Sequence, residues 1–262
     1  MINNDLIKEA ARRLREAEFK KEVCAPLREI LGTEDLSAAY AVQQYNAKLR
    51  RAAGAKVVGH KIGLTSLAVQ EQFGIDQPDY GLLWNDKEVN NGGEVSMSEL
   101  MQAKAEAEIA FVLSKDLNSD CLSMVDIIQS IDFALCSIEI VGSRIKNWDI
   151  SITDTIADNA SASHWLVAHK PVKLNDFDVV NCKMIMKKNG QIESEGFGKS
   201  CIGSPLNAVL WLAKKMVEMG KPLKQGDLVL SGALGPMVTV EAGDFIEVEI
   251  EGLGGASVSF VE

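Results

Sequence analysis

Apolar residues in the first part of the chain recur at the spacing of an α-helix. A first stripe is formed by Leu6, Ile7, Ala10, Ala11, Leu14 and Ala17. A second stripe follows Thr33-Glu34-Asp35, a sequence typical of a helix N-cap with an acidic first turn, and it ends before Gly54. Its members are Ala38, Ala39, Val42, Tyr45 and Leu49. These stripes predict amphipathic helices and hence a helical N-terminal region over residues 1–56.

After residue 57 the pattern changes to short strands separated by glycines. Residues 106–113 alternate at period two, and residues 135–141 form a second short apolar run. Residues 182–188 lead into Asn189-Gly190, a strong hairpin signal, and further runs occur at 228–230, 237–240, 245–250 and 257–261. One helix interrupts them, with Ser204 as N-cap, Pro205 in the first turn and Gly220 at its end. The prediction is an α+β fold, with a helical cap on a mixed, strand-rich body over residues 57–262.

Composition and charge narrow the class of protein. The 262 residues are 47% hydrophobic and 24% charged, which is typical of a globular chain. The formal net charge of −10 disfavours binding to a nucleic-acid backbone. No apolar run reaches the roughly 18–20 residues of a membrane helix, and the polar N-terminus lacks a signal-peptide core. We therefore expect a cytoplasmic protein without nucleic-acid or membrane partners.

Cysteine and histidine are too sparse to suggest a zinc site. The five cysteines are scattered, none of them in a C-x-x-C pair, and there are only three histidines. The cysteines are interpreted as small buried side chains. Any metal site is therefore sought among carboxylates.

Three glutamates interrupt apolar strand-like segments. Glu106 and Glu108 are two residues apart, so a strand would place both on one face, and Glu139 lies in a similar apolar run. Like charges so close together need a cation or protons to compensate them. One interpretation is an all-oxygen site for Mg²⁺ or Mn²⁺. The alternative is that Glu106 and Glu108 line a solvent-facing surface while Glu139 pairs with Arg144.

Lys61 and Asp79 are further candidates for chemistry. Lys61 lies in an apolar stretch between glycines, where a lowered pKa would suit acid–base chemistry, although a surface lysine is the simpler interpretation. Asp79 follows Pro78 in a segment that reads as a loop, where most aspartates only cap turns. No nucleophile elbow, P-loop or dinucleotide-binding motif is present.

Several sequence blocks combine the candidate residues with glycine-marked turns. They are residues 59–65 (GHKIGLT), 76–81 (DQPDYG), 106–109 (EAEI), 139–144 (EIVGSR), 154–161 (DTIADNAS), 205–208 (PLNA) and 231–236 (SGALGP). In this order the blocks resemble the 2-keto-4-pentenoate hydratases of the fumarylacetoacetate hydrolase superfamily. The resemblance covers almost the whole chain and implies a β-sandwich or roll body of the superfamily's type. One departure is Ser204, where members of the group often carry a histidine. Any substrate contact of that histidine is thereby put in doubt.

The resemblance implies a site and a reaction. Glu106, Glu108 and Glu139 would hold a divalent metal, Mg²⁺ or Mn²⁺. Lys61 and Asp79 would transfer protons and Ser161 would contact substrate or water, while Leu64 and Ser231 would contact the substrate. The implied enzyme is a hydro-lyase that adds water to a 2-hydroxy-2,4-dienoate, giving a 4-hydroxy-2-oxo acid in the meta-cleavage degradation of aromatic compounds.

Two other functions stay open at this point. A 4-oxalocrotonate decarboxylase would use the same three glutamates to lose CO₂. A non-catalytic partner subunit would keep the fold, although none of the three glutamates is missing here. The resemblance further implies a homo-oligomer of up to ten copies and allows association with other enzymes of the pathway.

Overall fold

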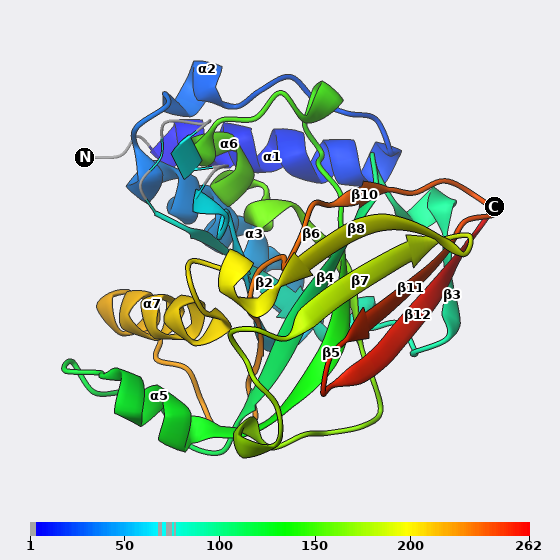
Figure 1. Ribbon diagram of the computed structural model, residues 1–262. Helices are drawn as coiled ribbons and strands as arrows, with labels where there is room; N and C mark the ends of the chain where they lie inside the picture. The colour runs from blue at the N-terminus through cyan, green and yellow to red at the C-terminus, as the bar shows by residue number, and fades with distance from the viewer. Residues whose placement is uncertain (1–3, 68–69, 72–74, 76) are drawn as a thin grey trace.

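A computed structural model describes residues 4–67, 70, 71, 75 and 77–262 (Figure 1). The helices are α1 (Asn4–Lys20), α2 (Arg28–Leu31), α3 (Leu36–Ala52), α5 (Met124–Ser130), α6 (Ile152–Ala157) and α7 (Pro205–Glu218). The strands are β1 (Val57–Gly63), β2 (Asp79–Trp84), β3 (Gly93–Ser96), β4 (Lys104–Leu113), β5 (Ile131–Val141), β6 (Ala162–Val167), β7 (Lys183–Lys188), β8 (Gln191–Phe197), β9 (Leu228–Leu230), β10 (Val238–Thr239), β11 (Phe245–Ile250) and β12 (Gly254–Val261). Two short 3₁₀ turns carry residues of the candidate site, η3 (Lys146–Trp148) and η4 (Asn159–Ser161).

The N-terminal helices confirm the predicted helical region. Asp35 caps α3 by accepting a hydrogen bond from the backbone N–H of Ala38, so the helix begins later than predicted and its first turn has no acidic residue. The apolar stripe of α1 is buried except for Leu6, and α1 packs against α3, which in turn packs on α6. One hydrophobic core includes both these helices and the strands, so the helical region is part of the same packed unit.

The larger sheet curls into a roll. In the described part of the chain it runs in the order β2-β1-β9-β4-β5-β6, with β10 paired to β4. Its outermost strands approach each other, because Glu88, just after β2, forms a bridge with Trp165 of β6. The indole Nε1 of Trp165 also donates a hydrogen bond to the carbonyl oxygen of Trp84 (3.1 Å). The roll therefore has an inner face that is almost enclosed.

Strand alternation selects the side chains of this inner face, which has an apolar half and a polar half. One half is apolar and consists of Leu83, Ala110, Leu135, Trp165, Leu228 and Leu230. The registers of the paired strands place Lys61, Asp79, Glu106, Glu108 and Glu139 on the same face. The apolar half therefore borders the charged side chains and keeps water away from them. The sheet itself sets the spacing of these charged side chains.

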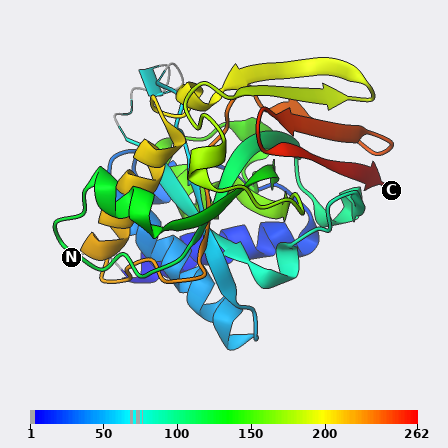
Figure 2. The same ribbon diagram turned by 60° about the horizontal axis from the view of Figure 1, so that its bottom comes forward.

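The second sheet covers part of the roll from outside. Its described strands run β3-β12-β11-β7-β8, and β11 and β12 pack against β5. In Figure 2 this sheet lies on one side of the roll and the blue N-terminal helices on the other. The predicted hairpin at Asn189-Gly190 is confirmed as the turn between β7 and β8, with both residues at positive φ. The predicted α+β cap-and-roll fold is confirmed.

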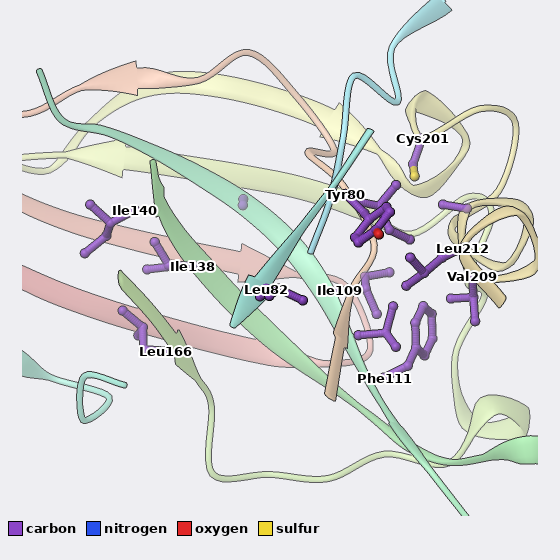
Figure 3. Close-up of a cluster of buried hydrophobic side chains, with 14 of the residues drawn as sticks. Tyr80, Leu82, Ile109, Phe111, Ile138, Ile140, Leu166, Cys201, Val209 and Leu212 are labelled. Atoms are coloured by element: carbon purple, nitrogen blue, oxygen red, sulfur yellow. The ribbon is translucent and has the colours of Figure 1, made fainter. Parts of the chain in front are cut away.

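Helix α7 closes the opposite end of the core. Ser204 caps it and Pro205 occupies its first turn, as predicted, and α7 lies beside α5 (Figure 1). Figure 3 shows Val209 and Leu212 of α7 near Phe111 of β4. These side chains are almost completely inaccessible to solvent, so α7 shields the outer face of the strand that carries two of the glutamates.

Among the described residues, no helix is both long and apolar enough to cross a membrane.

Candidate metal and substrate site

The three glutamates meet inside the roll. Glu106 of β4 lies directly opposite Glu139 of β5, and Glu108 follows two residues along the same face. Each side chain offers a ligand atom within 4.8 Å of the other two. Glu108 and Glu139 are fully buried and Glu106 is partly buried. The alternative of a solvent-facing surface is therefore wrong, because the curled sheet turns this face inward.

Burial leaves these carboxylates short of compensating partners. It raises the pKa of Glu139 to about 7, and it raises the pKa values of Glu108 and Glu106 as well. The backbone N–H of Gly232 donates to Glu108 Oε2 (2.8 Å). Glu108 Oε1 and Glu139 Oε1 accept no hydrogen bond from any described residue. Converging, unsatisfied carboxylate oxygens are the donor set that a hard divalent cation prefers.

Lys61 joins the cluster from β1. Its ammonium lies 3.3 Å from Glu139 Oε2 and donates a hydrogen bond to the carbonyl oxygen of Ala160 (3.0 Å). The side chain is buried, so the interpretation as a surface lysine is wrong. Burial by itself lowers the pKa of Lys61, but attraction to Glu139, Glu106 and the other carboxylates outweighs it and the net shift is upward. The expected lowered pKa is therefore not produced by the protein's own side chains.

Asp79 is the first residue of β2 rather than part of a loop, and it pairs with Gly63. A Cβ on Gly63 would overlap Asp79 Oδ1 and would lie 3.4 Å from Lys61 Nζ, so both groups pack over this glycine. Asp79 Oδ2 accepts a hydrogen bond from Thr155 Oγ1 (3.3 Å), while Oδ1 accepts none from the described residues. Burial raises the pKa of Asp79. Asp76, in the same sequence block, lies outside the described residues.

The turn η4 presents Ser161 to the site. Asn159, Ala160 and Ser161 all have positive φ, an uncommon conformation that other contacts must enforce. The carboxamide of Asn159 bonds both backbone groups of Leu82 on the edge strand β2 (2.8 and 3.0 Å). Ser161 is buried, and its hydroxyl has no hydrogen-bond partner among the described residues. It is thus held with a free hydroxyl.

Arg144 supports this turn and does not pair with Glu139. Its guanidinium donates to the Asp158 carboxylate and to the Asp158 carbonyl oxygen, and both residues are buried. The backbone N–H of Arg144 also donates to Asp158 Oδ2 (3.0 Å). The alternative pairing of Glu139 with Arg144 is wrong, because Arg144 lies beyond the end of β5 while Glu139 points into the roll.

The two candidate substrate contacts are placed differently. Leu64, at positive φ directly after β1, lines the cavity beside the glutamates. Ser231 does not line it, because its buried hydroxyl lies against backbone at Ile109 and Gly232. Ser231 instead precedes Gly232, whose N–H holds Glu108.

A cavity of about 190 Å³ opens onto this cluster. Its polar lining includes Lys61, Asp79, Glu106 and Ser161, all of which the sequence indicated. The sequence did not indicate Lys104, Trp148, Thr155, Ile150, Ile152 and Met237, which also line it. Period-two spacing from Glu106 could have indicated Lys104. No local signal could have indicated Trp148, since a separate turn brings it to the cavity.

A larger cavity, of about 480 Å³, lies behind the turn η4. It is bounded by α1 and α3 and includes Phe19, Trp84 and Arg144 in its lining. The three glutamates, Lys61 and Ser161 are not part of its lining. We therefore assign the chemistry to the smaller cavity, where unsatisfied carboxylates converge.

Comparison with known proteins assigns the chain to a family. Residues 61–261 match the model of the fumarylacetoacetate (FAA) hydrolase C-terminal family. The chain belongs to the fumarylacetoacetate hydrolase family. It is 50% identical over 256 residues to the TodF product hydratase of Pseudomonas putida, covering 98% of this chain and 96% of that protein. It is 49% identical over 251 residues to 2-keto-4-pentenoate hydratase 1 of Dechloromonas aromatica, covering 96% and 95%.

A solved structure has nearly the same fold. The 4-oxalocrotonate decarboxylase of Pseudomonas putida G7, complexed with magnesium and adipate, superposes with a TM-score of 0.95. It is 30% identical in sequence, and the match covers 100% of this chain and 99% of that one. The predicted family resemblance is confirmed. The fold is shared between a hydratase-like sequence and a decarboxylase, so the reaction must be argued from the site.

Proposed function

We propose that the protein is a metal-dependent hydro-lyase that hydrates a 2-hydroxy-2,4-dienoate of the 2-hydroxypenta-2,4-dienoate type. The observation that carries this proposal is the meeting of Glu106, Glu108 and Glu139 with buried Lys61, at a cavity that Glu106 and Lys61 line. The relatives named as hydratases, matched over almost their full length, support the same reaction class. The product is the corresponding 4-hydroxy-2-oxo acid, as expected for an enzyme in meta-cleavage degradation of aromatic compounds.

The glutamates fit a divalent metal, Mg²⁺ or Mn²⁺. Two of their buried oxygens, Glu108 Oε1 and Glu139 Oε1, accept no hydrogen bond from the described residues. Carboxylate oxygens suit both ions, and a magnesium complex of the decarboxylase supports this choice. When bound, such a cation supplies Lewis-acid stabilisation of negative charge at the substrate's 2-oxygen. Glu139 would then be shared between that cation and Lys61.

The remaining side chains supply proton transfer. In the overall reaction the 2-hydroxyl proton is lost, C5 gains a proton, and water adds across C3 and C4. Lys61 and Asp79 pack over the same glycine, Gly63, so both can reach one bound substrate. Thr155 holds one oxygen of Asp79 and leaves the other free for a proton. We assign Lys61 and Asp79 as the proton-transfer pair, and Ser161 as a polar contact to substrate or water.

The apolar part of the cavity suits a short hydrocarbon chain. Leu64, Val141, Ile150, Ile152 and Met237 contribute to its lining. These residues exclude water from the dienol and keep it beside the proton-transfer pair. None of the described residues of the N-terminal helices lines this cavity, so we propose that residues 1–56 form a cap that supports the catalytic body.

A second candidate is 4-oxalocrotonate decarboxylation. The close structural match to that decarboxylase favours it, and the glutamate cluster would serve both reactions. The substrate of a decarboxylase of this kind carries a second carboxylate, however. Besides Lys61, the described lining of the present cavity offers one cation, Lys104, so a second carboxylate would find no further cationic partner there. We therefore place hydration first.

The deciding experiment offers both substrates to the purified protein. With Mg²⁺ or Mn²⁺, the ultraviolet absorbance of 2-hydroxypenta-2,4-dienoate should disappear and a product heavier by one water should form. A chelator should abolish the reaction. Release of CO₂ from 4-oxalocrotonate without hydration of the dienol would instead identify a decarboxylase. Tight metal binding without turnover of either compound would indicate a non-catalytic partner subunit.

We also propose that the protein works as a homo-oligomer. Phe19 is 88% exposed at the end of α1, and it borders the 480 Å³ cavity that plays no part in the chemistry. Large exposed aromatic side chains beside a hollow are typical of protein interfaces. Sedimentation at micromolar concentration should show an assembly, and a single monomer boundary would contradict this proposal.

A further inference from the structure

Lys104 lies at the edge of the metal and substrate site and has no part in the reaction described so far. It is the first residue of β4, two residues before Glu106, and it lines the cavity. Strand alternation therefore puts Lys104, Glu106 and Glu108 on one face, with Lys104 furthest from the buried end. Its side chain is partly buried, and no ion pair involves it among the described residues. Such a cation is available to a ligand.

The Lys104 ammonium is held over an aromatic ring. Its Nζ lies 4.7 Å from the ring centroid of Trp148, which also lines the cavity. A cation–π contact keeps the charge fixed and partly desolvated without neutralising it. This differs from Lys61, which is already engaged by Glu139 and the Ala160 carbonyl. Lys104 thus keeps its charge for an anion.

The turn that carries Trp148 is built around Gln102. Asn147, Trp148 and Gln102 itself all have positive φ, and none of them is glycine. The carboxamide of Gln102 donates to the carbonyl oxygens of Ser143 (2.8 Å) and Ile145 (2.7 Å) and accepts from the Asn147 N–H (2.8 Å). Trp148 Nε1 donates to the Gln102 carbonyl oxygen (3.0 Å). Strained backbone held by this many contacts is typical of a functional position.

We propose that Lys104, positioned by Trp148, is the residue that recognises the substrate carboxylate next to the 2-oxygen. This inference rests on the proposed function, because it names a substrate contact in that site. Lys104 precedes Glu106 by two residues on the same strand face, so its charge lies beside the glutamate cluster. An anion drawn to the glutamates' cation would meet the Lys104 ammonium as well. The apolar lining then receives the hydrocarbon end.

The charge balance of the cavity supports the same assignment. Glu106, Glu108 and Glu139 carry three formal charges, which a divalent cation and Lys61 would just balance when Asp79, the fourth carboxylate at this cavity, is protonated. An anionic substrate entering that neutral cluster needs a further cation. Lys104 is the cavity-lining residue in the described part of the chain that supplies it. A substrate with one carboxylate is therefore matched, whereas a second carboxylate would have no partner.

Binding of pyruvate tests the proposal without any turnover. Pyruvate carries the carboxylate and the 2-oxygen of the proposed substrate, and calorimetry can measure its binding to Mn²⁺-loaded and Mn²⁺-free protein. We expect Lys104→Met to weaken pyruvate binding by about 10- to 100-fold, the loss typical of a charge-assisted contact. Mn²⁺ binding should be as tight or tighter, because a positive charge beside the glutamates has been removed. Lys104→Arg should restore most of the pyruvate affinity.

Lys146→Met is the matched control. Lys146 is exposed on the same turn as Trp148 and does not line the cavity, so both affinities should be unchanged. Trp148→Leu should weaken pyruvate binding less than Lys104→Met, because the charge remains but is no longer positioned.

Three results would overturn the assignment. In the first, Lys104→Met binds pyruvate as the unmodified protein does. In the second, it loses Mn²⁺ affinity, so that Lys104 supports the metal site instead. In the third, it loses affinity only for a dicarboxylate such as 2-oxoadipate, which would place Lys104 at the far end of the substrate. Failure of the hydration assay alone would leave these binding results intact and would reject only the proposed function.

Discussion

Glu106 and Glu139 lie directly opposite each other on the antiparallel strands β4 and β5, inside the roll. Acidic residues directly opposite each other destabilise a sheet unless their charge is compensated. Here the cost is increased by burial, which raises the pKa values of both groups. The pair is therefore explained as part of a cation site. Glu108 adds a third carboxylate to this site, and Lys61 adds a positive charge that offsets part of their negative charge.

Removing one of these carboxylates should weaken metal binding and, with it, activity. We expect Glu108→Ala to weaken Mn²⁺ binding by about 100-fold or more, since a ligand and its charge are lost together. Activity should collapse and should recover in part at high Mn²⁺ or Mg²⁺. Calorimetric titration with Mn²⁺ measures the first effect. Glu193→Ala, on an exposed position of β8, is the control and should bind Mn²⁺ normally. Unchanged affinity in Glu108→Ala would mean that the carboxylate site has been assigned wrongly.

Lys61 should be needed for turnover and not for holding the metal. We expect Lys61→Met to lower kcat by about 10²–10⁴-fold, the range for a lost general acid or base. The metal ligands remain, so added Mn²⁺ should not repair the loss. Lys56→Met, an exposed lysine just before the same strand, should have full activity. The division of roles is disproved if Lys61→Met loses its metal and recovers on adding more.

Gly63 should matter because of the carboxylate that packs over it. A Cβ at this position would overlap Asp79 Oδ1, and Asp79 is enclosed by Thr155 and the strand. We expect Gly63→Ala to displace the carboxylate and to lower kcat to about the level of Asp79→Asn, 10²-fold or more. Circular dichroism should remain that of the unmodified protein. Normal kcat in Gly63→Ala would show that the position of Asp79 is not critical.

The buried pair of Arg144 and Asp158 should contribute to stability through the turn that carries Ser161. Arg144→Met leaves the Asp158 carboxylate without its cation, and breaking a buried pair costs about 3–5 kcal/mol. Chemical denaturation should show this loss. The double variant Arg144→Met/Asp158→Asn should recover part of it, because no uncompensated charge remains. Additive losses in the double variant would argue against a direct pair.

His60 should make the protein less stable in mild acid. It is buried beside the Tyr80 ring, and burial, followed by repulsion from Arg51 and Lys221, lowers its pKa to about 4. The unfolded chain, with a histidine pKa near 6.5, binds more protons than the folded chain between pH 6.5 and 4. Stability therefore falls as the pH falls through this window.

The expected size of this effect is about 2 kcal/mol lost by pH 5 through His60 alone. Denaturation at pH 7, 6 and 5 measures it. His60→Gln should lose less stability over this range than the unmodified protein does. The control is His169→Gln, at an exposed position, which should follow the unmodified protein. Parallel losses in His60→Gln and the unmodified protein would show that another group is responsible.

Local pattern was enough for the elements and for the glutamates. Period-two alternation around Glu106 and Glu108 depends only on strand geometry, and β4 has that geometry. The capped helix after Ser204 and the hairpin at Asn189-Gly190 follow equally from local backbone preferences. Together with Glu139 and the order of the sequence blocks, this predicted the family and the cluster of three carboxylates.

Only the tertiary structure decided what each charged group meets. Closure of the roll places the glutamates on its inner side. It pairs Lys61 with Glu139, whereas Arg144 pairs with Asp158. It also placed Ser231 against backbone and brought Trp148 over Lys104 from a separate turn. Sequence periodicity reports which face of an element a side chain occupies. It carries no information on which distant element will cover that face, because strand order and curvature are set by packing of the whole core.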